Sequence, residues 1–424
     1  MKDEYGLIDL HKLVCHPEWV RRWHAAQGNW ELARNIYPLY IEVSPAGQCN
    51  HRCPWCAVDY IGYKKRILNF DRFKFALEGM TNRRMVGEDW NGVKSIMFAG
   101  EGEPTLHPKL AEMVVATKKV GIDVALTTNG TAMNVNFIDR ALPHITWIKV
   151  SLDAASAPTH ALNHHASLNQ FALAIQDLAY ASKLRAELVV KFKGEFEKIL
   201  GNIRYACKLN AELGLNCMIG AQLLMNPTNI DEIYEFAKLM KEIGCDYCVI
   251  KPYSRGLYST NRQEDILGSN FRYGDFLYLA EGLDELNSSG YNVVFRSRTM
   301  QSYEDADRRY AVCQATPMAW GYIMASGDFL SCSAYWPQDI GCGDQRFVLG
   351  NINSQGFDEI WEGELRYRNW EFVRNELNIS ECRKNCRMNA VNIFLWNEVR
   401  NSTLEDLEKL FPIIEQVPRN VNFI

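Results

Sequence analysis

The sequence predicts an α/β fold in which a parallel sheet forms a barrel that is followed by a smaller, cysteine-rich domain. Between about Tyr37 and Tyr253, short β-branched runs alternate with stretches of helical periodicity, which is the sequence form of repeated βα units. The 424 residues, 47% of them hydrophobic, suffice for one large barrel and a second domain. Cysteines are absent from residues 249–312 and return in the segment that follows.

Short apolar runs between polar loops are expected to form the strands of the barrel. They are Tyr40 to Val43, Ser95 to Ala99, Asp123 to Thr127, Trp147 to Leu152, Glu187 to Phe192, Met218 to Leu223 and Tyr247 to Ile250. Between the last two, Asn229 to Gly244 has apolar residues at helical spacing and a glycine where the helix would end. Because the loops after parallel strands converge at one end of a barrel, functional residues are expected there.

Pattern and composition divide the chain into five predicted segments. These are a helical prefix (residues 1–37), the barrel (38–255), a connecting helical region (256–305), the cysteine-rich domain (306–395) and a helical tail (396–424). The prefix is too short to be a separate peptide-binding domain. Leu404, Leu407 and Leu410 place an apolar stripe along the tail, which indicates packing rather than function.

Charge and cysteine usage narrow the class of protein. A net charge of -5 gives no basic surface for nucleic acid. No apolar run approaches the length of about 20 residues that crosses a bilayer, and the chain begins without a secretion signal, so we expect a cytoplasmic protein without membrane contact. Thirteen cysteines in such a protein indicate metal ligands rather than disulfides.

Three cysteines stand close together directly after the first expected strand. Cys49, Cys53 and Cys56 form a C-x3-C-x2-C pattern. A cubane iron–sulfur cluster usually takes four thiolates, so three from one loop leave one iron open to a small-molecule chelator. A zinc site is the alternative, although structural zinc sites are closed by four protein ligands and this loop offers three. Three loop cysteines without any metal are the remaining possibility.

This loop, with Trp55 just before its last cysteine, resembles the signature of the radical S-adenosylmethionine (SAM) enzymes. The resemblance implies a partial (β/α)6 TIM-like barrel and a [4Fe–4S] cluster whose open iron is chelated by SAM. It further implies that an electron, supplied by a flavodoxin- or ferredoxin-type donor, cleaves SAM. The resulting 5′-deoxyadenosyl radical would then abstract a hydrogen atom from the substrate.

The same resemblance implies the SAM contacts, which lie at the ends of expected strands. Gly102-Glu103-Pro104 is similar to the Gly-Gly-Glu-Pro motif that binds the SAM amino group, although Glu101 stands where the family more often has its first glycine. The other implied contacts are Asn129 in a Thr-Asn-Gly turn, Ser151 and Asp153 after the fourth strand, and Trp55 as a shield for the adenine. Lys191, on the expected strand Glu187 to Phe192, is a candidate partner of the SAM carboxylate.

Several other residues are predicted from strand alternation and local pattern. Lys251, Tyr253 and Arg255 would share one face at the mouth of the barrel, and Lys251 and Tyr253 are the candidates for catalytic substrate contact. Three histidines, His160, His164 and His165, are expected in a surface loop. Cys245 and Cys248 are expected to be structural, because buried cysteine behaves as a small hydrophobe.

The later cysteines resemble the auxiliary-cluster domain at the end of many radical SAM enzymes, called SPASM or, in its smaller version, twitch. The Gly-x4-Cys element at Gly327 to Cys332 and the Gly-Asn-Ile to Ile-Trp segment carry this resemblance. It implies one auxiliary [4Fe–4S] cluster on Cys313, Cys332, Cys382 and Cys386. Cys342 is either a substitute ligand or a free thiol, and a four-thiolate zinc site is the alternative.

The function expected from this resemblance is hydrogen abstraction from a small polar substrate such as a sugar, an aminocyclitol or a nucleotide-linked sugar. Dehydrogenation, epimerisation and dehydration all remain open as outcomes. A peptide-modifying radical SAM enzyme is the first alternative. An iron–sulfur electron carrier without SAM chemistry is the second, although it has no need of Glu103, Ser151 and Asp153. A zinc-binding nucleic-acid module is a third, which the acidic charge disfavours.

Overall fold

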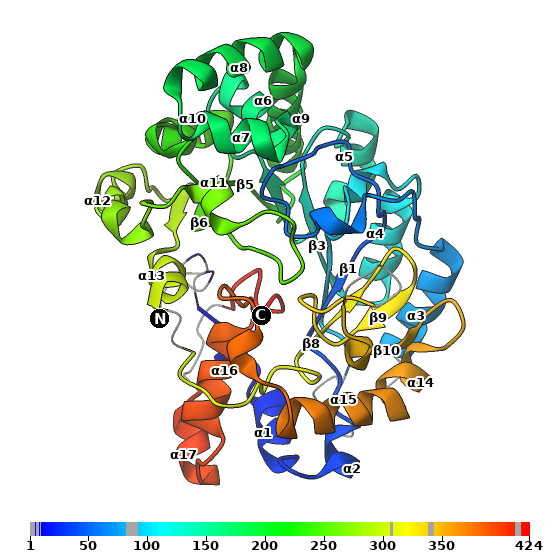
Figure 1. Cartoon of the computed structure of the whole chain (residues 1–424). Helices are drawn as coiled ribbons and strands as arrows, with labels where there is room; N and C mark the ends of the chain where they lie inside the picture. The colour runs from blue at the N-terminus through cyan, green and yellow to red at the C-terminus, as the bar shows by residue number, and fades with distance from the viewer. Residues whose placement is uncertain are drawn as a thin grey trace.

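The protein is organised around one long, mostly parallel sheet (Figure 1). The computed structural model describes residues 5, 8, 10–81, 92–305, 308–337, 343–411 and 417–424. The sheet has ten strands in the order β10-β9-β8-β1-β2-β3-β4-β5-β6-β7. The predicted α/β class and parallel sheet are therefore confirmed. Among the described residues, no helix has the length and apolar character needed to span a bilayer.

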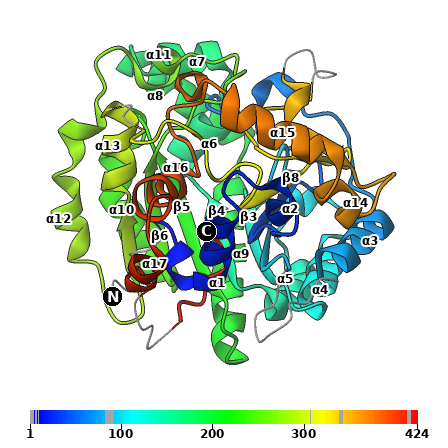
Figure 2. The same cartoon turned by 90° about the horizontal axis from the view of Figure 1, so that it is seen from below.

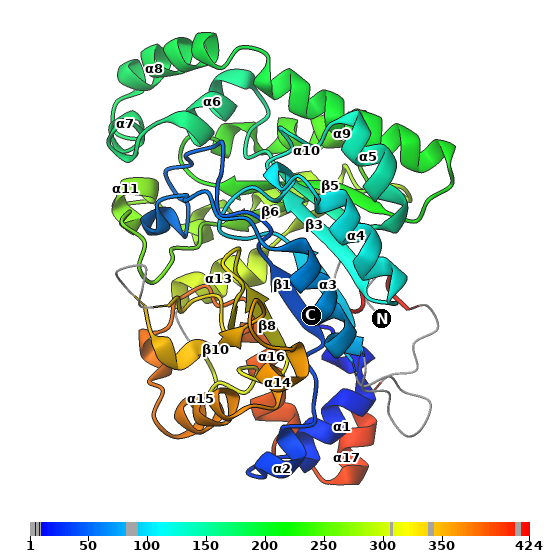
Figure 3. The same ribbon diagram turned by 90° about the vertical axis from the view of Figure 1, so that its right-hand side faces the viewer.

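Six consecutive parallel strands form the barrel portion of the sheet. They are β1 (Tyr40–Val43), β2 (Ser95–Phe98), β3 (Asp123–Thr128), β4 (Trp147–Ser151), β5 (Met218–Met225) and β6 (Tyr247–Pro252). The helices that cover their outer face include α3 (Phe70–Thr81), α4 (Leu110–Lys119), α5 (Val135–Ala141), α9 (Glu195–Glu212) and α10 (Ile233–Ile243). Figure 3 shows α3, α4 and α5 lying along the strands. The predicted helix corresponds to α10, which ends at Gly244 in the left-handed conformation.

The strand predicted at Glu187 to Phe192 is wrong, because this segment lies in helix α8 (Leu178–Lys191). Asp177 caps the helix, and its carboxylate accepts hydrogen bonds from the backbone N–H groups of Ala179 and Tyr180. The chain between β4 and β5 also forms α6 (Ala157–His165), α7 (Leu168–Ala174) and α9. Two adjacent valines gave this stretch a strand-like composition, yet Val190 is 74% exposed and the buried residues are spaced as on a helix.

The cysteine-rich region continues the same sheet. Its strands are β8 (Trp320–Ile323), β9 (Asp328–Leu330) and β10 (Val348–Asn351). Strand β8 pairs in parallel with β1, so that Tyr40 lies opposite Trp320 and Val43 opposite Ile323. Strands β8 and β9 form an antiparallel hairpin whose turn contains Gly327 at a φ of +89°. At the opposite edge, β7 (Asn292–Phe295) pairs with β6.

Helices from the first and last parts of the chain lie close together (Figure 2). Helices α1 (Pro17–Ala25) and α2 (Trp30–Ala33) share an apolar cluster with α16 (Asn389–Phe394) and α17 (Leu404–Lys409). In the described part of the predicted helical tail, residues 417–424 form no helix. Its last residues lie against the amino-terminal ends of the strands, where the Phe423 ring contacts those of Tyr40 and Trp147, and Ser95 Oγ donates to Asn422 O.

Candidate active site

The three clustered cysteines lie in the loop that follows β1. Cys49, Cys53 and Cys56 are free thiols, and all three line one cavity of about 1040 Å³ inside the barrel. The loop after β2 packs directly on them. A Cβ on Gly102 would come within 2.2 Å of Gln48 O, so only glycine allows this approach.

The donor set fits an iron–sulfur cluster. Burial raises the pKa of the Cys49 thiol to about 12, raises that of Cys53 well above its usual value and also raises that of Cys56, while the neighbouring thiols add to the shift for Cys49 and Cys53. Neighbouring thiols of this kind bind metal as thiolates, so a bound cluster would supply the positive charge that stabilises them. Three sulfur donors on one loop are the number that leaves one iron of a cubane open.

Glu103 joins the ends of β2 and β3 at the cavity wall. Its carboxylate accepts hydrogen bonds from Thr105 Oγ1, from Thr128 Oγ1 and, at 2.7 Å, from the Asn129 backbone N–H. The Asn129 side chain in turn donates to Asn50 Oδ1 at 2.8 Å, inside the cysteine loop. Gly102, Glu103 and Asn129 all line the cavity with the cysteines. Their contact with SAM stays a prediction, and their positions beside the loop suit it.

Ser151 and Asp153 mark the end of β4 and also line the cavity. Asp153 has a φ of +55°, a strained conformation for a non-glycine residue, and its Oδ1 accepts the Leu224 N–H at 2.6 Å. Burial raises the pKa of Asp153 to about 6. Trp55, predicted to shield the adenine, lines the cavity and packs edge-on against Phe171 at 5.4 Å between ring centroids.

Lys191 does not lie with these residues. It is the last residue of α8, it is exposed, and it is not part of the cavity wall. The prediction that it meets the SAM carboxylate rested on the strand that proved to be a helix, and we withdraw it.

Of the two residues predicted to contact substrate, the structure places only Lys251 at the cavity. Tyr253 is fully buried elsewhere, where its hydroxyl donates to Asn261 Oδ1 and its N–H donates to Tyr273 Oη at 2.8 Å. Arg255 is likewise tied to Asn261 O. Strand β6 ends at Pro252, so the alternation that grouped these three side chains stops before Tyr253.

Sequence reasoning missed other charged groups in the barrel interior. Lys149 on β4 lines the cavity together with Ser151, two residues further along the same strand face. Arg387 reaches into the barrel and pairs with Glu42 of β1, and it also donates to Tyr40 Oη at 2.9 Å. Alternation along β4 was a usable signal for Lys149. The Arg387–Glu42 pair joins distant parts of the chain, and no local pattern indicated it.

The second group of cysteines reaches the same cavity through Cys386. Cys313, Cys332, Cys382 and Cys386 are free thiols. Burial raises the pKa values of Cys313, Cys332 and Cys382, and neighbouring thiols of the group add to each of these shifts. Tyr335 Oη lies 3.2 Å from Cys382 Sγ, and Arg308 donates to Cys382 O at 2.7 Å. This donor set fits a fully ligated cluster. Cys386 lines the cavity, whereas Cys342 lies outside the described residues.

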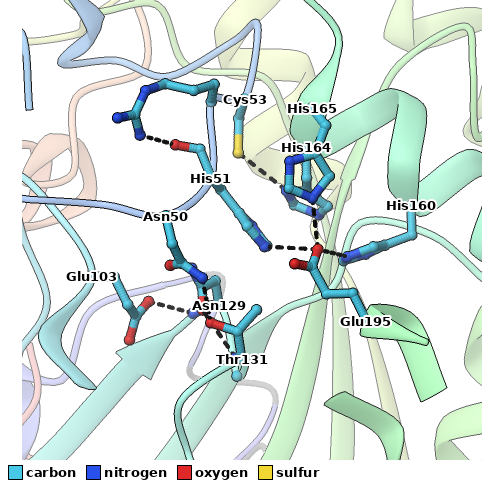
Figure 4. A network of polar contacts seen from close by, with 12 residues as sticks. Asn50, His51, Cys53, Glu103, Asn129, Thr131, His160, His164, His165 and Glu195 are labelled. Atoms are coloured by element: carbon cyan, nitrogen blue, oxygen red, sulfur yellow. Dashed lines mark hydrogen bonds and ion pairs between the residues drawn. The ribbon is translucent and has the colours of Figure 1, made fainter. Parts of the chain in front are cut away.

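The three histidines expected on a surface loop lie on a helix, with His160 and His164 buried and His165 partly buried, so that expectation is wrong. His160, His164 and His165 belong to α6, where they meet His51 of the cysteine loop and Glu195 of α9 (Figure 4). His164 Nδ1 lies 3.1 Å from Cys53 Sγ. No local pattern indicated this contact, because it depends on how α6 and α9 pack over the loop. Cys245 and Cys248 are buried in the core, as a structural role requires.

Two family models match the chain. That of the radical SAM superfamily covers residues 43–240, and that of the SPASM iron–sulfur cluster-binding domain covers residues 313–387. The first range contains Cys49, Cys53 and Cys56. The second contains Cys313, Cys332, Cys382 and Cys386, and the structural pair Cys245 and Cys248 lies outside both ranges.

Individual proteins agree with these matches. The chain is 23% identical over 352 residues to a tungsten-containing aldehyde ferredoxin oxidoreductase cofactor-modifying protein of Pyrococcus furiosus, covering 81% of this chain and 85% of the relative. It is 28% identical over 112 residues to an S-adenosylmethionine-dependent nucleotide dehydratase of Flammeovirga pacifica, covering 26% and 37%. The fold is similar to that of Streptococcus suis SuiB bound to S-adenosylmethionine, with a TM-score of 0.55, 16% identity and coverage of 83% and 72%.

The family models, the fold and the cavity that unites both cysteine groups agree with one another. They confirm the resemblance found in the sequence, with iron–sulfur clusters and SAM as the cofactors of the family. This chain is a radical SAM enzyme with a C-terminal SPASM-type iron–sulfur domain.

Proposed function

We propose that this enzyme abstracts a hydrogen atom from a small polar substrate that carries negative charge and binds between the two cysteine groups. One observation supports this most: the cavity that joins the groups is lined by more cationic than anionic side chains. The cations are Lys12, Lys149, Lys251, Arg296, Arg298, Arg309, Arg383, Lys384 and Arg387. The acids are Glu42, Glu103, Asp153, Asp305 and Glu398, and Glu42 is already paired with Arg387.

Two lysines are the best placed to bind an anionic group. Lys149 on β4 and Lys251 on β6 both face the cavity, and in the described part of the chain neither ammonium group makes a hydrogen bond or an ion pair. Burial lowers the pKa of Lys251 to about 8 and that of Lys149 well below its usual value. Nearby cations add to both shifts, chiefly Lys251 for Lys149 and Arg296 for Lys251. A bound anion would stabilise both charges, so these residues would hold and orient the substrate.

Around this position, the other residues would hold the cofactors. Cys49, Cys53 and Cys56 would bind the first cluster, and Glu103, Asn129, Ser151 and Asp153 would position SAM at its open iron. When bound, the cluster and SAM would supply the radical chemistry that abstracts hydrogen from an unactivated C–H bond. Trp55 would cover the cofactor and exclude water.

Four cysteines, Cys313, Cys332, Cys382 and Cys386, would bind one auxiliary cluster. Because Cys386 lines the cavity, this cluster would lie near the substrate and serve as an electron route to or from it. That arrangement favours dehydrogenation, with epimerisation and dehydration as the alternatives. A flavodoxin- or ferredoxin-type protein would supply the electron that starts the reaction, as expected of a cytoplasmic enzyme.

A peptide substrate is the second candidate. SuiB, whose fold is similar, has been solved bound to its precursor peptide SuiA, but at 16% identity this likeness concerns the fold alone. The relative of greatest mutual coverage reported above is named for modifying a cofactor, which supports a small-molecule substrate for this chain.

The test is anaerobic reconstitution with iron and sulfide, followed by dithionite and SAM, with 5′-deoxyadenosine measured by chromatography. We expect deoxyadenosine from the native chain and none from a variant with Cys49→Ala, Cys53→Ala and Cys56→Ala. The variant should keep about half of the iron, because the auxiliary cysteines are intact. A native protein that is loaded with iron and sulfide but releases no deoxyadenosine, even with candidate substrates, would contradict the proposal and favour an electron carrier.

A further inference from the structure

Beside the cysteine loop, three imidazoles surround one carboxylate oxygen (Figure 4). The loop contributes His51, helix α6 contributes His160 and His165, and α9 begins with Glu195. The Nε2 atoms of the three histidines lie 3.2, 3.3 and 2.6 Å, respectively, from Glu195 Oε1. The proposed chemistry in the barrel makes no use of this group.

The group is deeply buried for so polar a set. His51 is 2% exposed and His160 1% exposed. Buried polar atoms are stable only with partners that complement them, because each loses its contact with water. The partners in this group therefore need to be accounted for atom by atom.

His160 presents a mismatch unless a cation is present. Its Nδ1 lies 3.2 Å from Leu152 O, and a carbonyl oxygen only accepts hydrogen bonds, so this nitrogen carries the proton. In the neutral ring, the Nε2 lone pair then points at Glu195 Oε1, which also offers only lone pairs. Two electron-rich atoms facing each other at 3.3 Å require a positive charge between them. An N–H donated to a backbone carbonyl is also how metal-binding histidines are oriented in proteins.

His51 faces the same carboxylate oxygen. Its Nε2 lies 3.2 Å from Glu195 Oε1, yet neither ring nitrogen has a hydrogen-bond partner among the described residues. Ligands bound to a tetrahedral zinc ion at about 2.0 to 2.1 Å lie about 3.3 Å from one another. The distances of 3.2 and 3.3 Å from Glu195 Oε1 match that separation. The ligand atoms of His51, His160 and Glu195 all lie within 4.8 Å of one another.

We infer that His51, His160 and Glu195 hold a divalent first-row transition-metal ion such as Zn²⁺ or Fe²⁺. Two imidazoles and a carboxylate suit either metal. His165, at the shorter distance of 2.6 Å, donates a hydrogen bond to the carboxylate and stacks on Phe192 at 3.5 Å between ring centroids. It is a positioning residue rather than a ligand.

The ion would have a route of entry and a structural purpose. The Glu195 side chain is 20% exposed and lines a small surface pocket with Asn50 and Lys198. Because His51 stands midway between Cys49 and Cys53, the ion would fasten the cysteine loop to α6 and α9. The site would exist whichever substrate the enzyme uses.

The experiment is a metal count on the anaerobically reconstituted holoenzyme after dialysis with about one equivalent of Zn²⁺. Cubane clusters contain equal numbers of iron and sulfide atoms, so an extra metal appears either as one zinc or as one iron in excess of sulfide. We expect one such metal per chain in the native protein. A Glu195→Gln variant should lose it, with at least tenfold weaker zinc binding and unchanged sulfide.

The control is Glu232→Gln, because Glu232 accepts hydrogen bonds from Ser156 and Thr159 at the other end of α6 and contacts no histidine. This variant should keep the metal. X-ray absorption at the zinc edge should show nitrogen and oxygen ligands at about 2.0 to 2.1 Å, whereas zinc in a cysteine site would show sulfur at about 2.3 Å. Three outcomes would overturn the inference: no extra metal in the native protein, equal metal retention by the two variants, or zinc with sulfur ligands alone. The positive charge of the group would then be a proton.

Discussion

At Lys149 and Lys251, two ammonium groups face one cavity without a counter-ion in the described part of the chain. We expect Lys149→Met and Lys251→Met each to weaken the binding of inorganic pyrophosphate by about ten- to a hundredfold, because a hydrogen bond to a charged group contributes about 1.5 to 3 kcal/mol. Calorimetry on the reconstituted enzyme measures this directly. Lys191→Met, at the exposed end of α8, is the matched control and should bind as the native enzyme does. Unchanged affinity in both cavity variants would contradict an anionic substrate.

The pH dependence of anion binding should follow Lys251. Burial lowers its pKa to about 8 in the free protein, and a bound anion raises it again. Affinity should therefore be constant below about pH 8 and fall as the pH rises above it, while the bound form still carries its proton. Sulfate is a suitable probe because its own charge does not change in this range. In Lys251→Met, the fall of affinity with rising pH should be shallower. If the fall is as steep as in the native enzyme, the pH dependence comes from another group.

Single residues also show how far sequence reasoning reached into the site. The C-x3-C-x2-C spacing predicted three ligands that do line one cavity, because all three lie on one short loop. Lys251 was placed correctly by strand alternation, and Tyr253 was not, because alternation holds only while the strand continues. Glu195 and His51 went unpredicted as partners, since only the packing of α9 on the loop brings them together.

Among the elements, the loop after β2 determines where the cysteine loop can lie. We expect Gly102→Ala to displace the cysteine loop, because its Cβ would meet Gln48 O at 2.2 Å, and to reduce iron incorporation at the first cluster severalfold. Gly201→Ala is the control, because this glycine lies within α9 with nothing within 4 Å of the added Cβ. That change should leave iron unchanged and raise helix stability by about 0.5 to 1 kcal/mol. Full iron loading of Gly102→Ala would contradict this prediction, because it would show that the cysteine loop can accommodate the added Cβ.

The elements of the barrel were largely predictable, and their exceptions have a physical cause. On β4, buried residues alternate with partly exposed ones, whereas β6 is buried along almost its whole length. Both strands could be recognised from their short apolar, β-branched runs. The connection between β4 and β5 contains four helices, and there a valine pair imitated a strand while helix α8 placed Val190 in solvent. The division of the chain into five segments stays a prediction.

For the whole molecule, the pairing of β8 with β1 predicts the effect of truncation. A chain that ends at residue 305 would expose the β1 edge, together with the apolar cluster that α16 and α17 cover, and should aggregate. A full-length Cys382→Ala, Cys386→Ala variant should stay monodisperse in size-exclusion chromatography and lose only the auxiliary iron. Comparing the truncated chain with the double cysteine variant separates the effect of losing the auxiliary cluster from the effect of losing strands β8 to β10. A truncated chain that remains folded and binds the first cluster would contradict this prediction.

The continuous sheet also limits how such enzymes can exchange parts. A recombination point between the barrel and the cysteine-rich region would join a β1 of one origin to a β8 of another, and the register from Tyr40–Trp320 to Val43–Ile323 would have to be recreated. Chimaeras designed to give this enzyme a foreign auxiliary domain should therefore take β1 and β8 from the same parent protein, so that their pairing is kept.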